Sequence, residues 1–220
     1  MAEFIGTAFL LVGVVGSGIM AERLTDDVGL QLLQNAFATA AVLVALILAF
    51  GEASGAHFNP AVTLAARLFG DLDTPTAAAY VVSQVAGAVV GVMTANVMFD
   101  LDAIHWSTKD RSSPNLVFAE VVATLGLLLI IFGVVRSGRA AAAPYAVGGY
   151  IAGAYYFTSS TSFANPAVSI ARTMSNTFAG IKPTSAPAFI AAQLLGAVAA
   201  VALIRVIYPH VSPKVGSDAD

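Results

Sequence analysis

Two short stretches of this chain decide its fold, because each carries the tripeptide Asn-Pro-Ala in the same frame. They read Ser54-Gly55-Ala56-His57-Phe58-Asn59-Pro60-Ala61-Val62 and Ser160-Thr161-Ser162-Phe163-Ala164-Asn165-Pro166-Ala167-Val168. Asparagine is a good N-cap residue, and proline is favoured at the first position of a helix. Each copy therefore predicts the start of a helix. Both starts lie between long apolar segments, which indicates two half-helices that meet inside a membrane.

The apolar segments themselves are long enough, or nearly so, to cross a membrane. Hydrophobic residues make up 58% of the chain and charged residues only 10%, whereas a soluble domain carries about 25% charged residues. A helix needs about 20 apolar residues to span the hydrocarbon core. We expect spanning helices, the fifth of them short, over Glu3–Ala21, Leu30–Gly51, Pro75–Phe99, Asn115–Val135, Ala141–Phe157 and Ala186–Ile207.

The helices that follow the two Asn-Pro-Ala motifs are too short to span. We expect them over about Pro60–Phe69 and Pro166–Ser175. Non-helical backbone at membrane depth is tolerated only where it is buried in protein or lines a cavity. The sequence therefore predicts an all-α membrane protein with six transmembrane helices and two re-entrant half-helices.

Other landmarks recur in the same order in the two halves of the chain. Glu3 and Glu120 each follow an alanine and stand four residues before a threonine, and Gln84 and Gln193 each begin the pattern Gln-x-x-Gly-Ala-Val. Each half contributes three spans, an odd number, so the halves should have opposite orientations in the membrane. We expect one channel domain over 1–220, built from inverted repeats of about 1–110 and 111–220, with its site near the bilayer midplane.

Together these features resemble an aquaporin of the major intrinsic protein family, from Glu3 to about Tyr208. The resemblance implies a bundle with one pore in every subunit, a homotetramer in the cell membrane, and water, small neutral solutes and lipid as partners. The net charge of −3 gives no reason to expect a nucleic-acid partner. Basic residues do not settle the orientation, so cytoplasmic termini are implied by the resemblance alone.

The predicted centre of the pore consists of Asn59-Pro60-Ala61 and Asn165-Pro166-Ala167. Two facing half-helix N-termini place about +0.5 charge each at the midplane. The side-chain amides of the two asparagines are expected to offer N–H donors to a passing hydroxyl group. Since a cation meets two positive helix ends and a water chain must reorient there, neutral solutes should pass while ions and protons are opposed.

Two carboxylates lie in apolar helices, where an ionisable group is a candidate for function. We interpret Glu3 and Glu120 as acceptors for loop N–H groups; the alternative is a proton relay. His57 is interpreted as a loop-orienting or pore-side hydrogen bonder. No cysteine and no second nearby histidine completes a metal site. With no nucleophile–base pair either, we expect neither an enzyme nor a cofactor.

The outer constriction departs from the pattern of the family. Most members carry an arginine three residues after the second asparagine, where this chain has Val168. The spacing of the family assigns the other lining positions to Thr39, Gly153 and Ser162. Four small side chains predict a wider, less polar constriction without an aromatic wall, because selectivity follows pore diameter, lining donors and electrostatic barriers. This set resembles the Arg-less bacterial aquaglyceroporins that are encoded with arsenic-resistance genes.

Arg172 lies one helical turn beyond Val168. It either satisfies loop carbonyls or supplies a guanidinium to the outer vestibule. The sequence as a whole predicts a passive channel for water and for larger neutral, hydroxylated solutes such as glycerol or arsenous acid. Two alternatives stay open: a channel mainly for water, and a coupled secondary transporter, which would need an ion site or a titrating group near its substrate.

Overall fold

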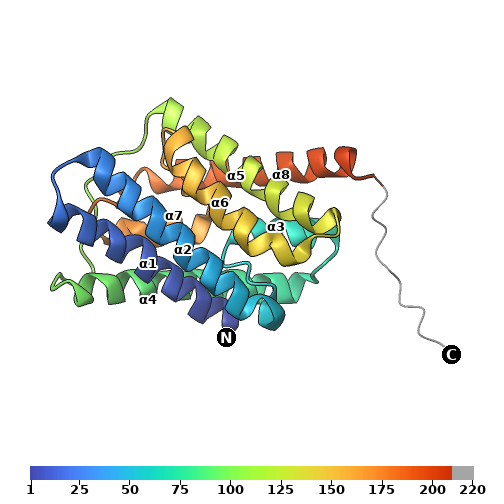
Figure 1. Cartoon of the computed structure of the whole chain (residues 1–220), viewed down its shortest axis with the longest axis horizontal. Helices are drawn as coiled ribbons and strands as arrows, with labels where there is room; N and C mark the ends of the chain where they lie inside the picture. The colour runs from blue at the N-terminus through green and yellow to red at the C-terminus, as the bar shows by residue number, and fades with distance from the viewer. Residues whose placement is uncertain (210–220) are drawn as a thin grey trace.

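The computed structural model of the chain describes residues 1–209, and within them it consists of helices and loops without a β-strand (Figure 1). Residues 210–220, which end the second predicted repeat, lie outside the described residues. The α-helices are α1 (Ala2–Leu24), α2 (Val28–Ser54), α3 (Pro60–Phe69), α4 (Thr74–Met98), α5 (Pro114–Arg136), α6 (Ala143–Phe157), α7 (Pro166–Ala171) and α8 (Ala186–Ile207).

The long helices correspond to the predicted spans. Five of them, α1, α2, α4, α5 and α8, are long and apolar enough to cross a membrane. The short fifth span is α6, which is preceded by one turn of 3-10 helix at Ala140–Ala142. The bundle is all-helical and is that of an integral, multi-pass membrane protein, as predicted.

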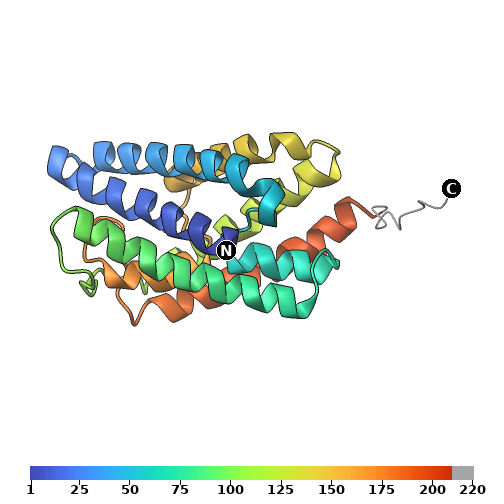
Figure 2. The same ribbon diagram turned by 90° about the horizontal axis from the view of Figure 1, so that it is seen from below.

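Glycines let the helices of each half pack closely. Helix α1 lies between α2 and α4, as Figure 2 shows, and α5 packs against α8. A methyl group added at Gly87 or Gly91 of α4 would overlap a backbone carbonyl oxygen of α1, and one at Gly196 of α8 would overlap the Val121 oxygen of α5. Small residues at such crossings are the usual means by which membrane helices approach.

The half-helices α3 and α7 begin where the two motifs predict. The first also ends as predicted, at Phe69. The second does not: α7 ends at Ala171, and a 3-10 turn over Arg172–Met174 replaces the predicted continuation to Ser175. The side chain of Asn96 donates to the Met174 oxygen at 2.9 Å and accepts from Ser175 Oγ at 2.8 Å. These contacts with α4 hold the end of the segment in a non-helical conformation.

Candidate functional site

Each motif asparagine caps the half-helix that follows it. The side-chain oxygen of Asn59 accepts from Ala61 N at 2.9 Å. That of Asn165 accepts from Ala167 N at 3.0 Å and Val168 N at 3.3 Å. Both asparagines have extended backbone conformations, and a proline follows at the first helical position. Both half-helices therefore begin at an asparagine N-cap followed by proline, as the motifs predict.

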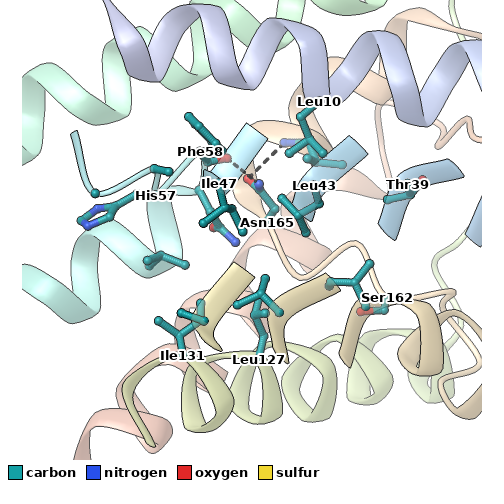
Figure 3. A pocket seen from close by; sticks show the side chains of 18 of the residues that line it. Leu10, Thr39, Leu43, Ile47, His57, Phe58, Leu127, Ile131, Ser162 and Asn165 are labelled. Atoms are coloured by element: carbon teal, nitrogen blue, oxygen red, sulfur yellow. Dashed lines mark hydrogen bonds between the residues drawn. The ribbon is translucent and has the colours of Figure 1, made fainter. Parts of the chain in front are cut away.

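The same two side chains link the two halves of the chain. Asn59 Nδ2 donates to the Ala164 oxygen at 2.7 Å. Asn165 Nδ2 donates to the Phe58 oxygen at 2.8 Å, and Figure 3 shows these two residues side by side. An amide nitrogen carries two N–H groups. One N–H of each asparagine is therefore used between the loops, and the other is left for the space between the half-helices.

Glu3 holds the loop before the first half-helix. Its buried carboxylate accepts from the backbone nitrogens of His57 at 3.0 Å and Phe58 at 2.7 Å. It also accepts from Ser54 Oγ at 2.6 Å and from Gln84 Nε2 at 2.7 Å. These four donors hold the carboxylate and the loop together, which favours a structural role for Glu3.

Glu120 makes the matching arrangement in the second half. Its carboxylate accepts from the backbone nitrogens of Phe163 at 2.9 Å and Ala164 at 2.8 Å, and from Gln193 Nε2 at 2.6 Å. Neither Glu120 nor Glu3 lines the cavity described below. Their place in the structure therefore favours the role of loop acceptor over that of proton relay.

The two loops share a strained backbone path. Ala56 and Phe58 in the first loop, and Ser162 and Ala164 in the second, have φ angles of 48°, 48°, 51° and 48°. The left-handed conformation costs a non-glycine residue about 1–2 kcal/mol. The bonds to the two carboxylates offset this cost. Such strain clusters at functional sites, where the surroundings impose it.

A cavity of about 240 Å³ passes the two asparagines. Much of its remaining lining is apolar and is formed by Leu10, Leu43, Ile47, Leu127 and Ile131, of which Leu127 and Ile131 lie across from Asn165 in Figure 3. Thr39 and Ser162 lie at one end of the cavity and His57 at the other. We call the end with Thr39 and Ser162, which Val168 also lines, the Val168 end. The other end is called the His57 end.

His57 lines its end of the cavity as a hydrogen-bonding side chain. Its Nδ1 lies 3.1 Å from Thr63 Oγ1, and its ring packs edge-on against Tyr80, with 5.5 Å between ring centroids. Among residues 1–209 there is no group of three or more His, Cys, Asp or Glu side chains that could hold a metal ion. An exposed carboxylate that the sequence analysis did not consider, Asp71, also lines this end.

Three of the four residues assigned to the constriction by spacing line the Val168 end: Thr39, Ser162 and Val168. The fourth assignment is wrong. Gly153 is exposed, does not line the cavity, and has only the Phe157 ring, at 3.8 Å, near a built Cβ atom. Spacing counted back from Asn165 runs through an irregular loop, so it does not set which face of α6 points inward.

Tyr155 stands where a small residue was expected. The lining residues of α6 are Ala143, Val147, Ile151 and Tyr155, which share one face because they are four residues apart. The Tyr155 hydroxyl lies 3.1 Å from Thr39 Oγ1 and is buried. The Val168 end therefore has an aromatic side chain, contrary to the expectation of an end without one. The four-residue spacing in α6 was the sequence signal for it.

Arg172 has a position compatible with both of the roles considered for it. It is 2% exposed, and its Nε donates to the carbonyl oxygen of Ala179 in the loop before α8. It also lines the Val168 end, with its guanidinium carbon 3.4 Å from the centroid of the Phe163 ring. Beside it, the buried hydroxyl of Ser162 has no hydrogen-bond partner within the described chain. The terminal amino groups of Arg172 remain able to bind a molecule in the cavity.

Comparison with known proteins agrees with this architecture. A family model described as "Major intrinsic protein" matches residues 1–155 and 140–219. The chain is 51% identical over 205 residues to "Aquaglyceroporin AqpS" of Rhizobium meliloti (strain 1021), covering 93% of this chain and 88% of that protein. It is 34% identical over 149 residues to "Aquaporin NIP1-2" of Arabidopsis thaliana, but there it covers 64% of this chain and only 50% of the relative.

A solved structure shares the fold. The X-ray structure of the aquaglyceroporin from Plasmodium falciparum superposes with a TM-score of 0.75 over 94% of this chain and 95% of that one, at 21% sequence identity.

Proposed function

The chain belongs to the major intrinsic protein family, and from the residues of its cavity we propose that it is a passive channel for neutral, hydroxylated solutes larger than water. Membership establishes the coarser statement: the protein is a membrane channel for water and small solutes and not an enzyme. The proposal concerns which solutes pass and which residues select them.

One observation carries the proposal: Val168 lines the cavity in the first turn of α7. The usual arginine of the family would extend a long guanidinium side chain from this position, whereas valine ends at its two methyl groups. With Thr39 and Ser162 as neighbours, the Val168 end keeps a width that an arginine would reduce. Pore diameter is the first determinant of which neutral solutes pass.

The polar groups at this end suit a solute with several hydroxyls. The paired hydroxyls of Thr39 and Tyr155 each both donate and accept hydrogen bonds. Val168 and Phe163 provide apolar surface next to them. On one side, the hydroxyl groups of a compact polyol can exchange their bound water for these protein hydroxyls. The less polar side of the solute then lies against the apolar wall. Glycerol and arsenous acid, As(OH)₃, are test solutes of this chemistry.

The remaining parts of the proposal follow the two motifs. Asn59-Pro60-Ala61 and Asn165-Pro166-Ala167 form the central barrier to ions, with the two half-helix N-termini facing each other. Glu3 and Glu120 support their loops through matching bonds, which favours inverted repeats. The working assembly is a homotetramer in the cell membrane, with a pore in every subunit.

Two alternatives remain testable. A channel mainly for water would show a low ratio of glycerol to water permeability. A coupled transporter would use a titrating group in the solute path, and Asp71 at the His57 end is the carboxylate in question. Because Asp71 is exposed, its charge is solvated rather than buried beside a solute. Solute flux that follows a proton gradient would support the transporter.

The test of the proposal is Val168→Arg in proteoliposomes, with water, glycerol, urea and arsenous acid permeabilities measured by stopped-flow light scattering. The ratio of glycerol to water permeability should fall, because the added guanidinium narrows the Val168 end more for glycerol than for water. Val28→Arg is the matched control, since Val28 is exposed at the start of α2 and does not line the cavity. An unchanged ratio in Val168→Arg would contradict the proposal.

A further inference from the structure

The residue that follows Val168 by one turn brings a guanidinium to the same lumen. Arg172 belongs to the 3-10 turn after α7 and lines the cavity together with Val168 and Phe163. We propose that Arg172 supplies the fixed positive charge of the Val168 end, so that one residue sets the width of the filter and another its charge. The inference rests on the proposed function, since it takes the Val168 end to be the filter.

Two contacts hold this guanidinium against the wall of the cavity. Its Nε donates to the Ala179 oxygen, and its plane lies over the Phe163 ring at 3.4 Å from the centroid. A guanidinium within about 6 Å of an aromatic centroid is attracted to the ring face. Because Phe163 itself lines the cavity, a side chain that lies on its ring stays at the wall. The charge is therefore present without the obstruction that an arginine at position 168 would add.

The outward part of the guanidinium is free to act on the lumen. Among the three guanidinium nitrogens of Arg172, only Nε has a hydrogen-bond acceptor within residues 1–209. The N–H groups of the two terminal nitrogens therefore remain available. A guanidinium has five N–H donors and stays protonated. Neutral solutes and water can accept hydrogen bonds from these donors as they pass. A cation, in contrast, is repelled by the positive charge of the guanidinium.

The charged groups around Arg172 leave a net positive charge at this end of the cavity. A second buried guanidinium, that of Arg111, lies 5.0 Å from the same Phe163 ring and donates to the oxygens of Gly180 at 3.0 Å and Ser160 at 3.2 Å. The partners of both arginines are thus neutral carbonyls and one aromatic ring. The buried carboxylate of Glu120, which is held by three neutral donors, lies close enough to both arginines to offset one of the two positive charges, so one remains in excess. The Val168 end therefore carries a net positive field, which repels cations before they reach the half-helix ends.

The test is Arg172→Met in proteoliposomes, with sodium and proton leak measured beside glycerol permeability. A unit charge about 5 Å from a passing cation, at an effective dielectric of about 40 in a hydrated lumen, changes a crossing rate roughly tenfold. We expect the cation leak to rise about tenfold. Glycerol is neutral and loses only hydrogen-bond donors, so its permeability should change by a smaller factor and the ratio of sodium to glycerol permeability should rise. Arg172→Lys, which keeps the charge, should restore the low leak.

Arg67 provides the matched control. It lies in the first half-helix, is exposed, is bound to Thr74 Oγ1 at 2.8 Å and does not line the cavity. Arg67→Met removes the same charge and should leave the leak at its wild-type value.

The result that overturns the inference is an Arg172→Met protein that inserts, conducts glycerol and keeps the wild-type cation leak. If that variant fails to insert, Arg172→Gln, which keeps an N–H for the Ala179 oxygen, gives the same comparison. The proposal about the width of the Val168 end and the proposal about its charge can be refuted separately. An unchanged solute ratio in Val168→Arg refutes the proposed function, whereas an unchanged leak in the Arg172 variants refutes only the role of Arg172.

Discussion

Replacing Glu120 by alanine should destabilise the channel more than the same change at Glu3. The Glu120 carboxylate is fully buried, and its removal leaves three buried N–H groups without an acceptor. These are the backbone N–H groups of Phe163 and Ala164 and one N–H of the Gln193 amide, whose other N–H donates to Ser169 Oγ. Each unsatisfied donor costs about 1–3 kcal/mol, so the three together cost about 3–9 kcal/mol. That is a large share of the roughly 5–15 kcal/mol by which a typical folded protein is stable.

Glu3 has more donors around it but a different environment. A second cavity, of about 210 Å³, lies beside Glu3 and is lined by Ser54 and Tyr80 as well. The Ser54 hydroxyl and the His57 N–H are only partly buried. Water can therefore reach some of the donors that Glu3→Ala releases, and a water-mediated bond replaces much of the lost energy. We expect Glu3→Ala to cost less than Glu120→Ala for this reason.

The measurement is the thermal unfolding midpoint, Tm, of purified protein in detergent. For a chain of this size 1 kcal/mol shifts Tm by about 2–4 °C, so Glu120→Ala should lower it by at least about 6 °C. Glu120→Gln keeps one acceptor oxygen and should fall between wild type and alanine. Glu52→Ala, an exposed position on α2, is the control. A Glu120→Ala channel with a wild-type Tm would refute this reasoning, and one that loses only pH-dependent transport would establish the proton relay.

Three further predictions concern the barrier, the packing and the loop before α5. Asn59→Asp or Asn165→Asp should raise sodium influx into proteoliposomes, because a carboxylate offsets the positive half-helix ends; no rise in inserted protein would count against the barrier. Gly91→Val should abolish the folded fraction on size-exclusion chromatography, since its side chain would overlap an α1 carbonyl, whereas Gly149→Val, with no atom within 4 Å of its built Cβ, should be tolerated. Burial and two nearby arginines lower the pKa of Lys109 from 10.5 to about 8. Between pH 8 and 10.5 the unfolded chain therefore binds more protons than the folded chain, and stability rises with pH. The Tm of the wild-type protein should rise from pH 8 to about pH 10 relative to the Tm of Lys109→Met. Parallel plots of Tm against pH for the two proteins would contradict this prediction.

The sequence by itself determined the features that depend on neighbours along the chain. The starts of α3 and α7 follow from an asparagine cap and a proline at the next position, and these are local interactions. The spans follow from the length of their apolar runs, because the bilayer sets how long a spanning helix must be. Even the family was evident from two motifs and a recurring pattern of Glu and Gln.

Only the tertiary structure decided which side chains meet in the lumen. The rotation of α6 about its axis brings Tyr155 inward and leaves Gly153 exposed, and this rotation depends on how the helix packs against α2 and α5. The early end of α7, and with it the direction of Arg172, depends on Asn96 of α4, far away in sequence. Spacing along a chain measures residue number, whereas a pore lining depends on the angle at which each side chain leaves its helix.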